Sequence, residues 1–267
     1  MPNPNITITA LPGEIRSHVE PIVQLAYPVQ GATSAVAVIH SRNGMFVVKR
    51  ATGTKYREWL QREYAVLRAL AATRLPVPRV YTYVEHSHQH HHEDWLLMDW
   101  LPGEPLRAML RATHYPAIRA VLLADFGRVL ATIHRCEPPP QLALPDQRWL
   151  DRTLERAAYY LQHDRVDGTA DLLQHLHQHR PPPTRETLIH GDYTLDNVLV
   201  KDQRICGIID WAGGAIGDPR YDLALATRPH PEAFQTADDR AAFYMGYGGE
   251  RLTEAEMAYF VGIYEFF

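Results

Sequence analysis

The sequence predicts an α+β fold with two lobes: a small N-terminal lobe built on an antiparallel β-sheet with one helix, and a larger, mostly helical C-terminal lobe. Two observations predict it. Short apolar runs bounded by turn residues dominate the N-terminal part, whereas longer segments with apolar residues at helical spacing follow.

The composition is that of a folded protein. With 267 residues, of which 46% are hydrophobic, the chain can build one large or two modest cores. A net charge of −4 argues against nucleic acid as a partner, because phosphate binding needs a basic face. No apolar run approaches a membrane span, and Cys136 and Cys206 lack metal or redox spacing. We therefore expect a cytoplasmic, reduced monomer or homodimer that binds neither nucleic acid nor membrane.

The sheet of the N-terminal lobe begins with two strands. Residues 35–39 and 45–48 are strand-like runs, and Asn43-Gly44 between them favours a tight hairpin turn. Lys49 closes the second strand. Taken alone, a lysine in this place indicates only a solvated strand end.

A helix is predicted over residues 55–72, because apolar side chains recur there at helical spacing. Glu63 falls inside this apolar face. A buried charge without a partner costs several kcal/mol, so a carboxylate on a core-facing stripe needs a cation. We therefore expect Glu63 to pair with Lys49.

Two further strand-like segments, residues 80–84 and 95–100, are separated by a polar insert rich in histidine, residues 86–92. Such a tract can bind a transition metal. No acidic or cysteine ligand pattern frames it beyond Glu93 and Asp94, so a solvated hairpin loop is favoured. Whether the tract binds metal stays open.

Asp192, Asn197 and Asp210 form the chemical centre of the sequence. Asp192 can accept or orient the proton of an attacking hydroxyl. The Asn197 amide oxygen and the Asp210 carboxylate are hard oxygen ligands that suit Mg²⁺ on the phosphates of ATP. The pattern predicts metal-assisted phosphoryl transfer, the chemistry of a kinase.

A predicted hairpin explains the spacing of these residues. Residues 198–200 and 205–209 read as two strands joined by a turn at Asp202-Gln203, which would return Asp210 beside the loop that it left. In the alternative, the loop is an ordinary turn and the second aspartate a strand-end cap. The flanking strands and the second aspartate together argue against that alternative.

These residues resemble the aminoglycoside phosphotransferase and choline kinase superfamily, which shares its fold with protein kinases. The resemblance runs from Gly31 to the C-terminus and is carried by His190-Gly191-Asp192, Asn197, Ile209-Asp210-Trp211 and Gly217-Asp218-Pro219-Arg220-Tyr221-Asp222-Leu223-Ala224. It implies a two-lobed protein-kinase-like fold, with the first lobe expected over residues 1–101 and the second over residues 102–267. By the same resemblance Asp192 is the catalytic residue, Asn197 and Asp210 bind Mg²⁺, and Asp218 and Asp222 brace the loop.

The resemblance also implies the nucleotide contacts. Lys49 and Glu63, once paired, would hold the α and β phosphates of ATP. Ser34 lies where the family often has a phosphate-binding Gly and Ser. Asp99 and Leu101 would lie in the hinge between the lobes, whose backbone reads the edge of the adenine. GTP stays open as an alternative nucleotide.

One triplet is set aside. Asp125-Phe126-Gly127 spells the metal-binding triplet of protein kinases, but it precedes Asp192, whereas that triplet must follow the catalytic loop. Its surroundings have helical spacing from residue 119 to residue 135, so we expect a core helix there. Helices are also expected over residues 149–162 and 170–179, between proline-rich turns.

The chain ends on Glu265-Phe266-Phe267, which is similar to aminoglycoside 3′-phosphotransferases. Those enzymes finish on an acidic residue followed by apolar ones, and the resemblance makes Glu265 and Phe267 substrate contacts. The segment after Asp210 departs from that group and has the form of the broader superfamily. The drug substrate and the phosphorylated hydroxyl therefore stay open.

The sequence thus predicts an ATP-dependent O-phosphotransferase that acts on a small molecule, with a cationic aminoglycoside antibiotic as the favoured substrate. One alternative is a metabolic kinase for homoserine, choline, a sugar or a related alcohol. A non-catalytic nucleotide-binding module is the second. It is disfavoured because the lysine, the glutamate, both aspartates and the asparagine that the chemistry needs are all in place.

Overall fold

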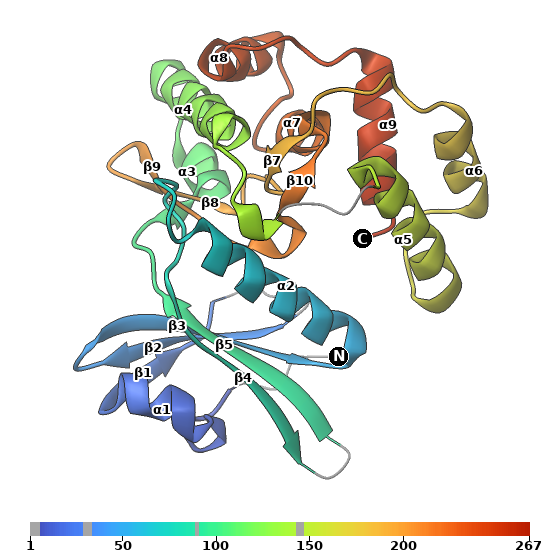
Figure 1. The fold of residues 1–267 in the computed structure, drawn as a ribbon. Helices are drawn as coiled ribbons and strands as arrows, with labels where there is room; N and C mark the ends of the chain where they lie inside the picture. The colour runs from blue at the N-terminus through green and yellow to red at the C-terminus, as the bar shows by residue number, and fades with distance from the viewer. Residues whose placement is uncertain (1–5, 29–33, 89–90, 143–146) are drawn as a thin grey trace. The chain divides into compact units, whose positions relative to one another are not determined.

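The computed structural model describes residues 6–28, 34–88, 91–142 and 147–267. The chain forms two compact units, which are described separately (Figure 1). The first unit comprises Met1–Pro102 and Gly207–Gly213, and the second comprises Gly103–Cys206 and Gly214–Phe267. The chain therefore returns once to the first unit before it completes the second.

The first unit is built on a five-stranded antiparallel sheet with the order β1-β2-β3-β5-β4. Its strands are β1 (Ile22–Ala26), β2 (Ala35–Ser41), β3 (Gly44–Thr52), β4 (Val80–His88) and β5 (His91–Asp99). The predicted fold class is confirmed: a small antiparallel sheet occupies the N-terminal part, and helices dominate the remainder (Figure 1).

Helices pack on both faces of this sheet. The longer helix, α2 (Thr54–Leu70), is the predicted one, and it contacts β3, β4 and β5. A shorter helix, α1 (Gly13–Val19), is additional to the single helix expected in this lobe. The buried side chains of Ile15 and Val19 in α1 pack with Trp95 and Leu97 of β5 in one core. A 3-10 turn (Ile8–Ala10) precedes α1 along the chain. Because successive side chains of a strand point to opposite faces of the sheet, the buried Leu96 lies on the face away from Trp95, Leu97 and α1.

The β2–β3 hairpin turns one residue earlier than predicted. Ser41 pairs with Gly44, so the central turn residues are Arg42 and Asn43 rather than Asn43 and Gly44. Asn43 is fixed there because its side-chain amide donates to the Glu20 carbonyl at 2.9 Å. Gly44 has a φ of 133°, a conformation that glycine adopts readily, and it begins β3.

The second unit is mostly helical. Its helices are α3 (Leu106–Ala112), α4 (Pro116–Arg135), α5 (Trp149–His163), α6 (Ala170–Gln178), α7 (Pro219–Thr227), α8 (Ala237–Tyr247) and α9 (Glu254–Tyr264). A 3-10 turn at Pro140–Leu142 also belongs to this unit, whereas the 3-10 turn η3 (Trp211–Gly213) belongs to the first unit. A core that includes Trp149, Tyr221, Phe260 and Phe266 joins α5, α6, α7 and α9. In the described residues no helix is long and apolar enough to cross a membrane.

The triplet at Asp125-Phe126-Gly127 lies in α4, as predicted. A Cβ on Gly127 would lie 2.0 Å from the Phe243 carbonyl oxygen, so glycine allows α4 to approach α8 closely. The Asp125 carboxylate accepts a hydrogen bond of 2.8 Å from the backbone N–H of Ile205. The triplet therefore serves packing within this unit.

Short strands frame the loop that holds the predicted catalytic aspartate. β7 (Thr187–Ile189) pairs with β10 (Ala215–Gly217), and β8 (Val198–Lys201) lies between β6 (Glu104–Pro105) and β9 (Arg204–Ile208). Asp202 and Gln203 join β8 to β9 with φ values of 51° and 60°. Two consecutive positive φ angles are typical of a tight hairpin turn, which confirms the predicted hairpin.

Candidate active site

Lys49 and Glu63 form a buried ion pair in the first unit. Lys49 Nζ donates to Glu63 Oε1 at 2.6 Å and to Oε2 at 2.8 Å. Both residues are more than nine-tenths buried. The pairing predicted from the sequence is confirmed, and it follows from two periodicities. Alternation along β3 directs Lys49 toward α2, and the helical period places Glu63 on the buried face of α2.

Asp210 completes this cluster in the first unit. Its carboxylate contacts Lys49 Nζ while remaining 46% exposed. Burial alone would lower the pKa of Lys49, but the negative charges of Asp210 and Glu63 outweigh burial and raise that pKa. Lys49 therefore stays charged. Asp210 also has a φ of 62°, an uncommon conformation for a residue with a side chain.

The expected contacts of the nucleotide base and phosphates lie at two places in the first unit. Ser34 directly precedes β2 and is half-buried, whereas residues 29–33 of the expected phosphate loop lie outside the described residues. Asp99 ends β5, and its carboxylate accepts hydrogen bonds from Tyr81 Oη at 2.7 Å and from the Arg79 N–H at 3.1 Å. Leu101 follows and is half-buried. The Asp99 side chain thus joins β4 to β5.

In the second unit, Asp222 holds the backbone of the predicted catalytic loop, residues 190–197. The N–H of His190 donates to Asp222 Oδ2 at 2.7 Å, and the N–H of Gly191 donates to Oδ1 at 2.8 Å. Asp222 is fully buried at the start of α7, and Gly191 has a φ of 79°. The brace expected of Asp222 is therefore present. Asp218 instead caps α7 through the N–H of Arg220 at 3.0 Å.

Asp192 and Asn197 are joined by their side chains. Asn197 Nδ2 donates to Asp192 Oδ2 at 2.8 Å and to the Asp192 carbonyl at 2.9 Å. Both amide hydrogens of Asn197 therefore have acceptors, and the orientation of its side-chain oxygen is fixed. His190 is fully buried, and its Nδ1 accepts the Asp192 N–H at 3.2 Å.

Tyr264 is a residue of this site that sequence reasoning missed. Its hydroxyl donates to Asp192 Oδ1 at 3.3 Å. The guanidinium carbon of Arg228 lies 4.7 Å from the centroid of its ring. The sequence places Tyr264 next to Glu265, a predicted substrate contact. No residue spacing in the sequence indicates that the last helix contacts the loop around Asp192.

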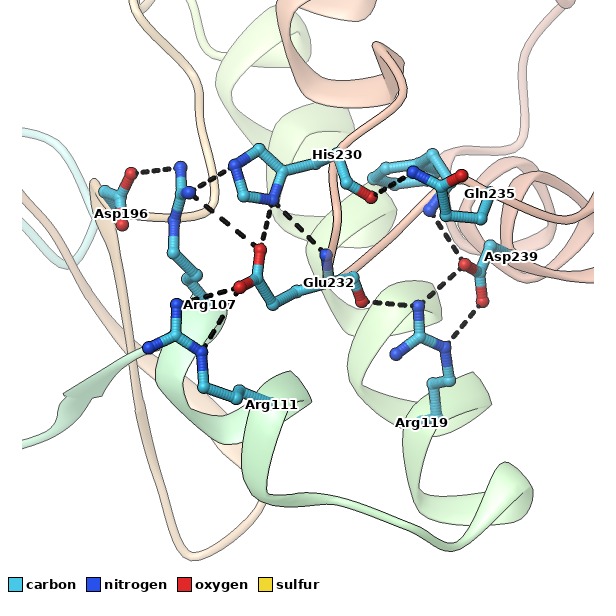
Figure 2. Close-up of polar contacts among 9 residues, drawn as sticks. Arg107, Arg111, Arg119, Asp196, His230, Glu232, Gln235 and Asp239 are labelled. Atoms are coloured by element: carbon cyan, nitrogen blue, oxygen red, sulfur yellow. Dashed lines mark hydrogen bonds and ion pairs between the residues drawn. The ribbon is translucent and has the colours of Figure 1, made fainter.

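The predicted catalytic loop also contacts α3 (Figure 2). Arg107 donates its backbone N–H to the Leu195 carbonyl at 3.0 Å and its guanidinium to Asp196. The same guanidinium contacts His230 Nε2. Because arginine only donates hydrogen bonds, Nε2 is the acceptor of this contact, while His230 Nδ1 faces Glu232.

The segment that contains His230 and Glu232 is itself held by two further arginines (Figure 2). Arg111 donates to Glu232 Oε1 at 2.8 Å. Arg119 donates to both carboxylate oxygens of Asp239, at 2.8 and 2.7 Å, and to the Glu232 carbonyl at 2.6 Å. These contacts connect α3 and α4 with α8 and with the segment that precedes it. Sequence reasoning did not identify this network, because its members are far apart along the chain.

The two residues expected to contact the substrate lie at the end of α9. The Glu265 carbonyl accepts the N–H of Gly168 at 2.8 Å, and Glu265 is half-buried. The ring of Phe267 packs in the helical core, 5.6 Å from the ring of Tyr160 and 5.3 Å from the Arg156 guanidinium. The Phe267 side chain is therefore engaged inside its own unit.

The histidine-rich insert forms the ends of β4 and β5. Ser87 Oγ lies 2.9 Å from His92 Nδ1, and His86 faces Glu93 at 3.7 Å across the hairpin. Among the residues that the structure describes, no group of three or more metal-ligating side chains forms a metal site. Residues 89 and 90 lie outside that part of the chain.

A small antiparallel sheet carrying a buried Lys–Glu pair, with a helical unit carrying an Asp–Asn loop, defines a protein with a kinase-like fold. Residues 27–259 match the model of the phosphotransferase enzyme family, and the chain belongs to this family. The superfamily predicted from the motifs is thereby confirmed.

Three curated relatives illustrate what the chain is similar to. Acyl-CoA dehydrogenase family member 10 of Mus musculus is 26% identical over 62% of this chain, which covers 16% of that protein. An aminoglycoside 3′-phosphotransferase of Niallia circulans is 25% identical over 73% of this chain and 74% of its own length. A homoserine kinase of Sinorhizobium medicae (strain WSM419) is 24% identical over 73% of this chain and 60% of its own length.

Solved structures support the same fold. An aminoglycoside 3′-phosphotransferase of type VIII superposes with a TM-score of 0.75 and 22% identity, over 95% of this chain and 98% of that one. A ternary complex of an aminoglycoside phosphotransferase with ADP and hygromycin B gives a TM-score of 0.59 and 19% identity, over 79% of this chain and 74% of that one. At these identities the likeness establishes the fold and no substrate.

Proposed function

We propose that this protein is an ATP-dependent O-phosphotransferase that transfers the γ-phosphoryl group to a hydroxyl of a small molecule. The observation that carries the proposal is the buried Lys49–Glu63 pair with Asp210 beside it, in a chain that belongs to a phosphotransferase family. The paired side chains of Asp192 and Asn197 in the second unit support it. A non-catalytic nucleotide-binding module would not need this second group.

The residues present fit a nucleotide with Mg²⁺. Lys49 offers a buried, charged ammonium for phosphate oxygens, and the half-exposed Asp210 carboxylate and the Asn197 amide oxygen are the hard donors that Mg²⁺ prefers. When bound, Mg²⁺ would offset negative charge on the phosphates. Ser34 is proposed as a phosphate contact, and the backbone at Asp99 and Leu101 as the contact of the base. ATP is the proposed nucleotide, since a family neighbour was solved with ADP.

Asp192 is the proposed catalytic residue. The acceptor oxygen forms a bond to the γ-phosphorus while the bond to the leaving oxygen breaks, and ADP keeps that electron pair. The acceptor hydroxyl proton passes to Asp192, whose carboxylate is oriented by Asn197. No covalent intermediate with the protein is involved. Lys49 holds the phosphates, with Glu63 fixing its position.

An aminoglycoside is the proposed acceptor, with Glu265 as its proposed ammonium contact and Phe267 as a second proposed contact. Support comes from the Niallia circulans relative, which shares about three quarters of its length with this chain. The second candidate is an amino alcohol such as homoserine, because a homoserine kinase is similar at nearly the same identity. The substrate in either case is a small molecule, and the proposed location of the enzyme is the cytoplasm.

The test is Mg²⁺-dependent ATP consumption by the purified protein with a panel of aminoglycosides, homoserine, choline and sugars, with Asp192→Ala as the control. We expect turnover with one acceptor class and its loss in the variant. Turnover that persists in Asp192→Ala would refute the assigned role. Silence with every acceptor, alongside intact ATP binding, would favour the nucleotide-binding module.

A second variant separates the two substrate classes. Glu265→Gln should raise the KM for an aminoglycoside about tenfold, because a partly buried contact between opposite charges is lost. Deleting the last three residues is a poorer test, since Phe266 is fully buried and its loss would damage the core. An unchanged KM in Glu265→Gln would remove the support that the chain end gives to the aminoglycoside proposal.

A further inference from the structure

The two oxygens of the Asp192 carboxylate have donors on different elements. Asn197 Nδ2, within the loop, donates to Oδ2 at 2.8 Å. Tyr264 Oη, on the last helix, donates to Oδ1 at 3.3 Å. One donor alone would leave the carboxylate free to rotate about its Cβ–Cγ bond. Two donors on different elements fix the plane of the group.

The Tyr264 hydroxyl is protonated at neutral pH and can donate a hydrogen bond. Burial and the negative charge of Asp192 raise the pKa of Tyr264 to about 12, although Arg228 opposes the shift. The phenol therefore keeps its proton and donates it to the carboxylate. It does not itself exchange a proton with the reaction.

Three features of the structure stabilise the position of Tyr264. α9 begins with a capping box in which Thr253 and Glu256 satisfy each other's backbone N–H groups, so the helix start is well defined. Ile263, the preceding residue, is fully buried in the helical core. The guanidinium of Arg228, just after α7, stacks on the Tyr264 ring at 4.7 Å. The hydroxyl is thus held by a rigid support.

We propose that Tyr264 is a positioning residue for phosphoryl transfer, and that it holds Asp192 Oδ1 in the orientation in which the carboxylate receives the acceptor proton. The inference rests on the proposed function, because it gives a role to a neighbour of the proposed catalytic residue. An ionised carboxylate has about four lone-pair sites, so it can accept from Tyr264, from Asn197 and from an acceptor hydroxyl at the same time.

The first test compares Tyr264→Phe with Tyr259→Phe. Both hydroxyls belong to α9, and burial raises the pKa of each to about 12, but Tyr259 donates to the Leu176 carbonyl at 3.1 Å instead of to Asp192. We expect kcat to fall about tenfold in Tyr264→Phe, with the KM of ATP and of the acceptor within about twofold of wild type. Tyr259→Phe should lower Tm and leave kcat unchanged.

Three kinetic outcomes would overturn the inference. The first is a wild-type kcat in Tyr264→Phe. The second is an equal loss of kcat in both variants, which would indicate a general effect on folding. The third is a lower acceptor KM with unchanged kcat, which would mean that the Tyr264 hydroxyl occupies the place of the acceptor.

A second measurement does not depend on turnover. The ¹³C-carboxyl resonance of Asp192 can be compared at one fixed neutral pH in wild type and in both variants. Because a donated hydrogen bond changes the shielding of the carboxyl carbon, the resonance should move in Tyr264→Phe and stay in place in Tyr259→Phe. An unmoved resonance in Tyr264→Phe would refute the contact. If the wild type phosphorylates no acceptor, the proposed function fails, while this comparison still decides whether Tyr264 contacts Asp192.

Discussion

Asp222 accepts the backbone N–H of Gly191 at 2.8 Å and so fixes the residue that precedes the proposed catalytic aspartate. Its other oxygen accepts the N–H of His190 at 2.7 Å. A fully buried carboxylate thus replaces the water that would otherwise satisfy a turn in the backbone. The backbone geometry of this loop therefore depends on Asp222 of α7, and the contribution of Asp222 can be measured.

Replacing Asp222 by alanine should destabilise the protein and abolish turnover. Two buried N–H groups would lose their acceptor, at a cost of about 2–5 kcal/mol in the free energy of unfolding. Urea denaturation measures this loss. Asp202→Asn, in the exposed β8–β9 turn, is the control and should change stability by less than about 0.5 kcal/mol. Equal stabilities for Asp222→Ala and wild type would show that the loop does not need this brace.

Glu63→Gln should weaken the productive binding of ATP. The amide keeps the size of the side chain but removes one of the two carboxylates that hold Lys49, so the ammonium loses its fixed position. We expect the KM for ATP to rise about tenfold, the equivalent of one lost interaction with a charged group. Glu58→Gln, on the exposed face of the same helix, should leave the KM unchanged. A similar rise in both variants would mean that α2 acts through its surface charge.

The Arg119–Asp239 pair should make stability depend on pH in the acid range. Burial alone would raise the pKa of Asp239, but the Arg119 guanidinium and the Phe234 N–H outweigh it and hold the pKa below its ordinary value of 3.8. A carboxyl with a lowered pKa contributes stability above the unfolded value, and this contribution is lost as the pH falls through the folded value. Asp239→Asn lacks the contribution at every pH.

Urea denaturation at about pH 7 and about pH 3 checks this sign. The stability difference between wild type and Asp239→Asn should be largest at the higher pH and smaller at the lower one. Asp238→Asn, at the exposed neighbouring position, should show almost no difference at either pH. A difference that grows on acidification would contradict the assigned direction.

Gly127→Ala tests the role of the triplet in α4. The added Cβ would meet the Phe243 carbonyl at 2.0 Å, so α4 and α8 must move apart at a cost of about 1–3 kcal/mol. Thermal unfolding should show a lower Tm, whereas the Mg²⁺ concentration needed for half-maximal turnover stays the same. Gly13→Ala is the matched control, since a Cβ there meets nothing within 4 Å. A changed Mg²⁺ requirement in Gly127→Ala would restore the triplet as a metal-site candidate.

Local periodicity was enough to predict part of the site. The pairing of Lys49 with Glu63 follows from a charge on the buried face of a helix and a lysine at the end of the neighbouring strand. The turn at Asp202-Gln203 follows from the two apolar runs that flank it. The two strands joined by the turn are adjacent in sequence, and Glu63 is a charged residue on the apolar face of its helix. Both features can be recognised from the sequence alone.

The missed residues depend on contacts between distant segments. Tyr264 reaches Asp192 only because α9 packs on the same helical core as α7, and Arg107 meets His230 only because α3 lies beside the segment after α7. Neither pair breaks a local pattern, so neither can be found from spacing. The additional helix α1 has few apolar positions of its own, and it is stabilised by burial of Ile15 and Val19 on the sheet.

The return of Gly207–Gly213 to the first unit has a consequence for how this protein can be divided into fragments. A fragment that stops at Pro102 would carry Lys49 and Glu63 but would lack Asp210, which lies in that returning segment. Separate expression of the proposed nucleotide-binding half therefore requires a second piece of chain, joined by a linker or supplied in trans. A single cut in the gene does not divide this protein into two working halves.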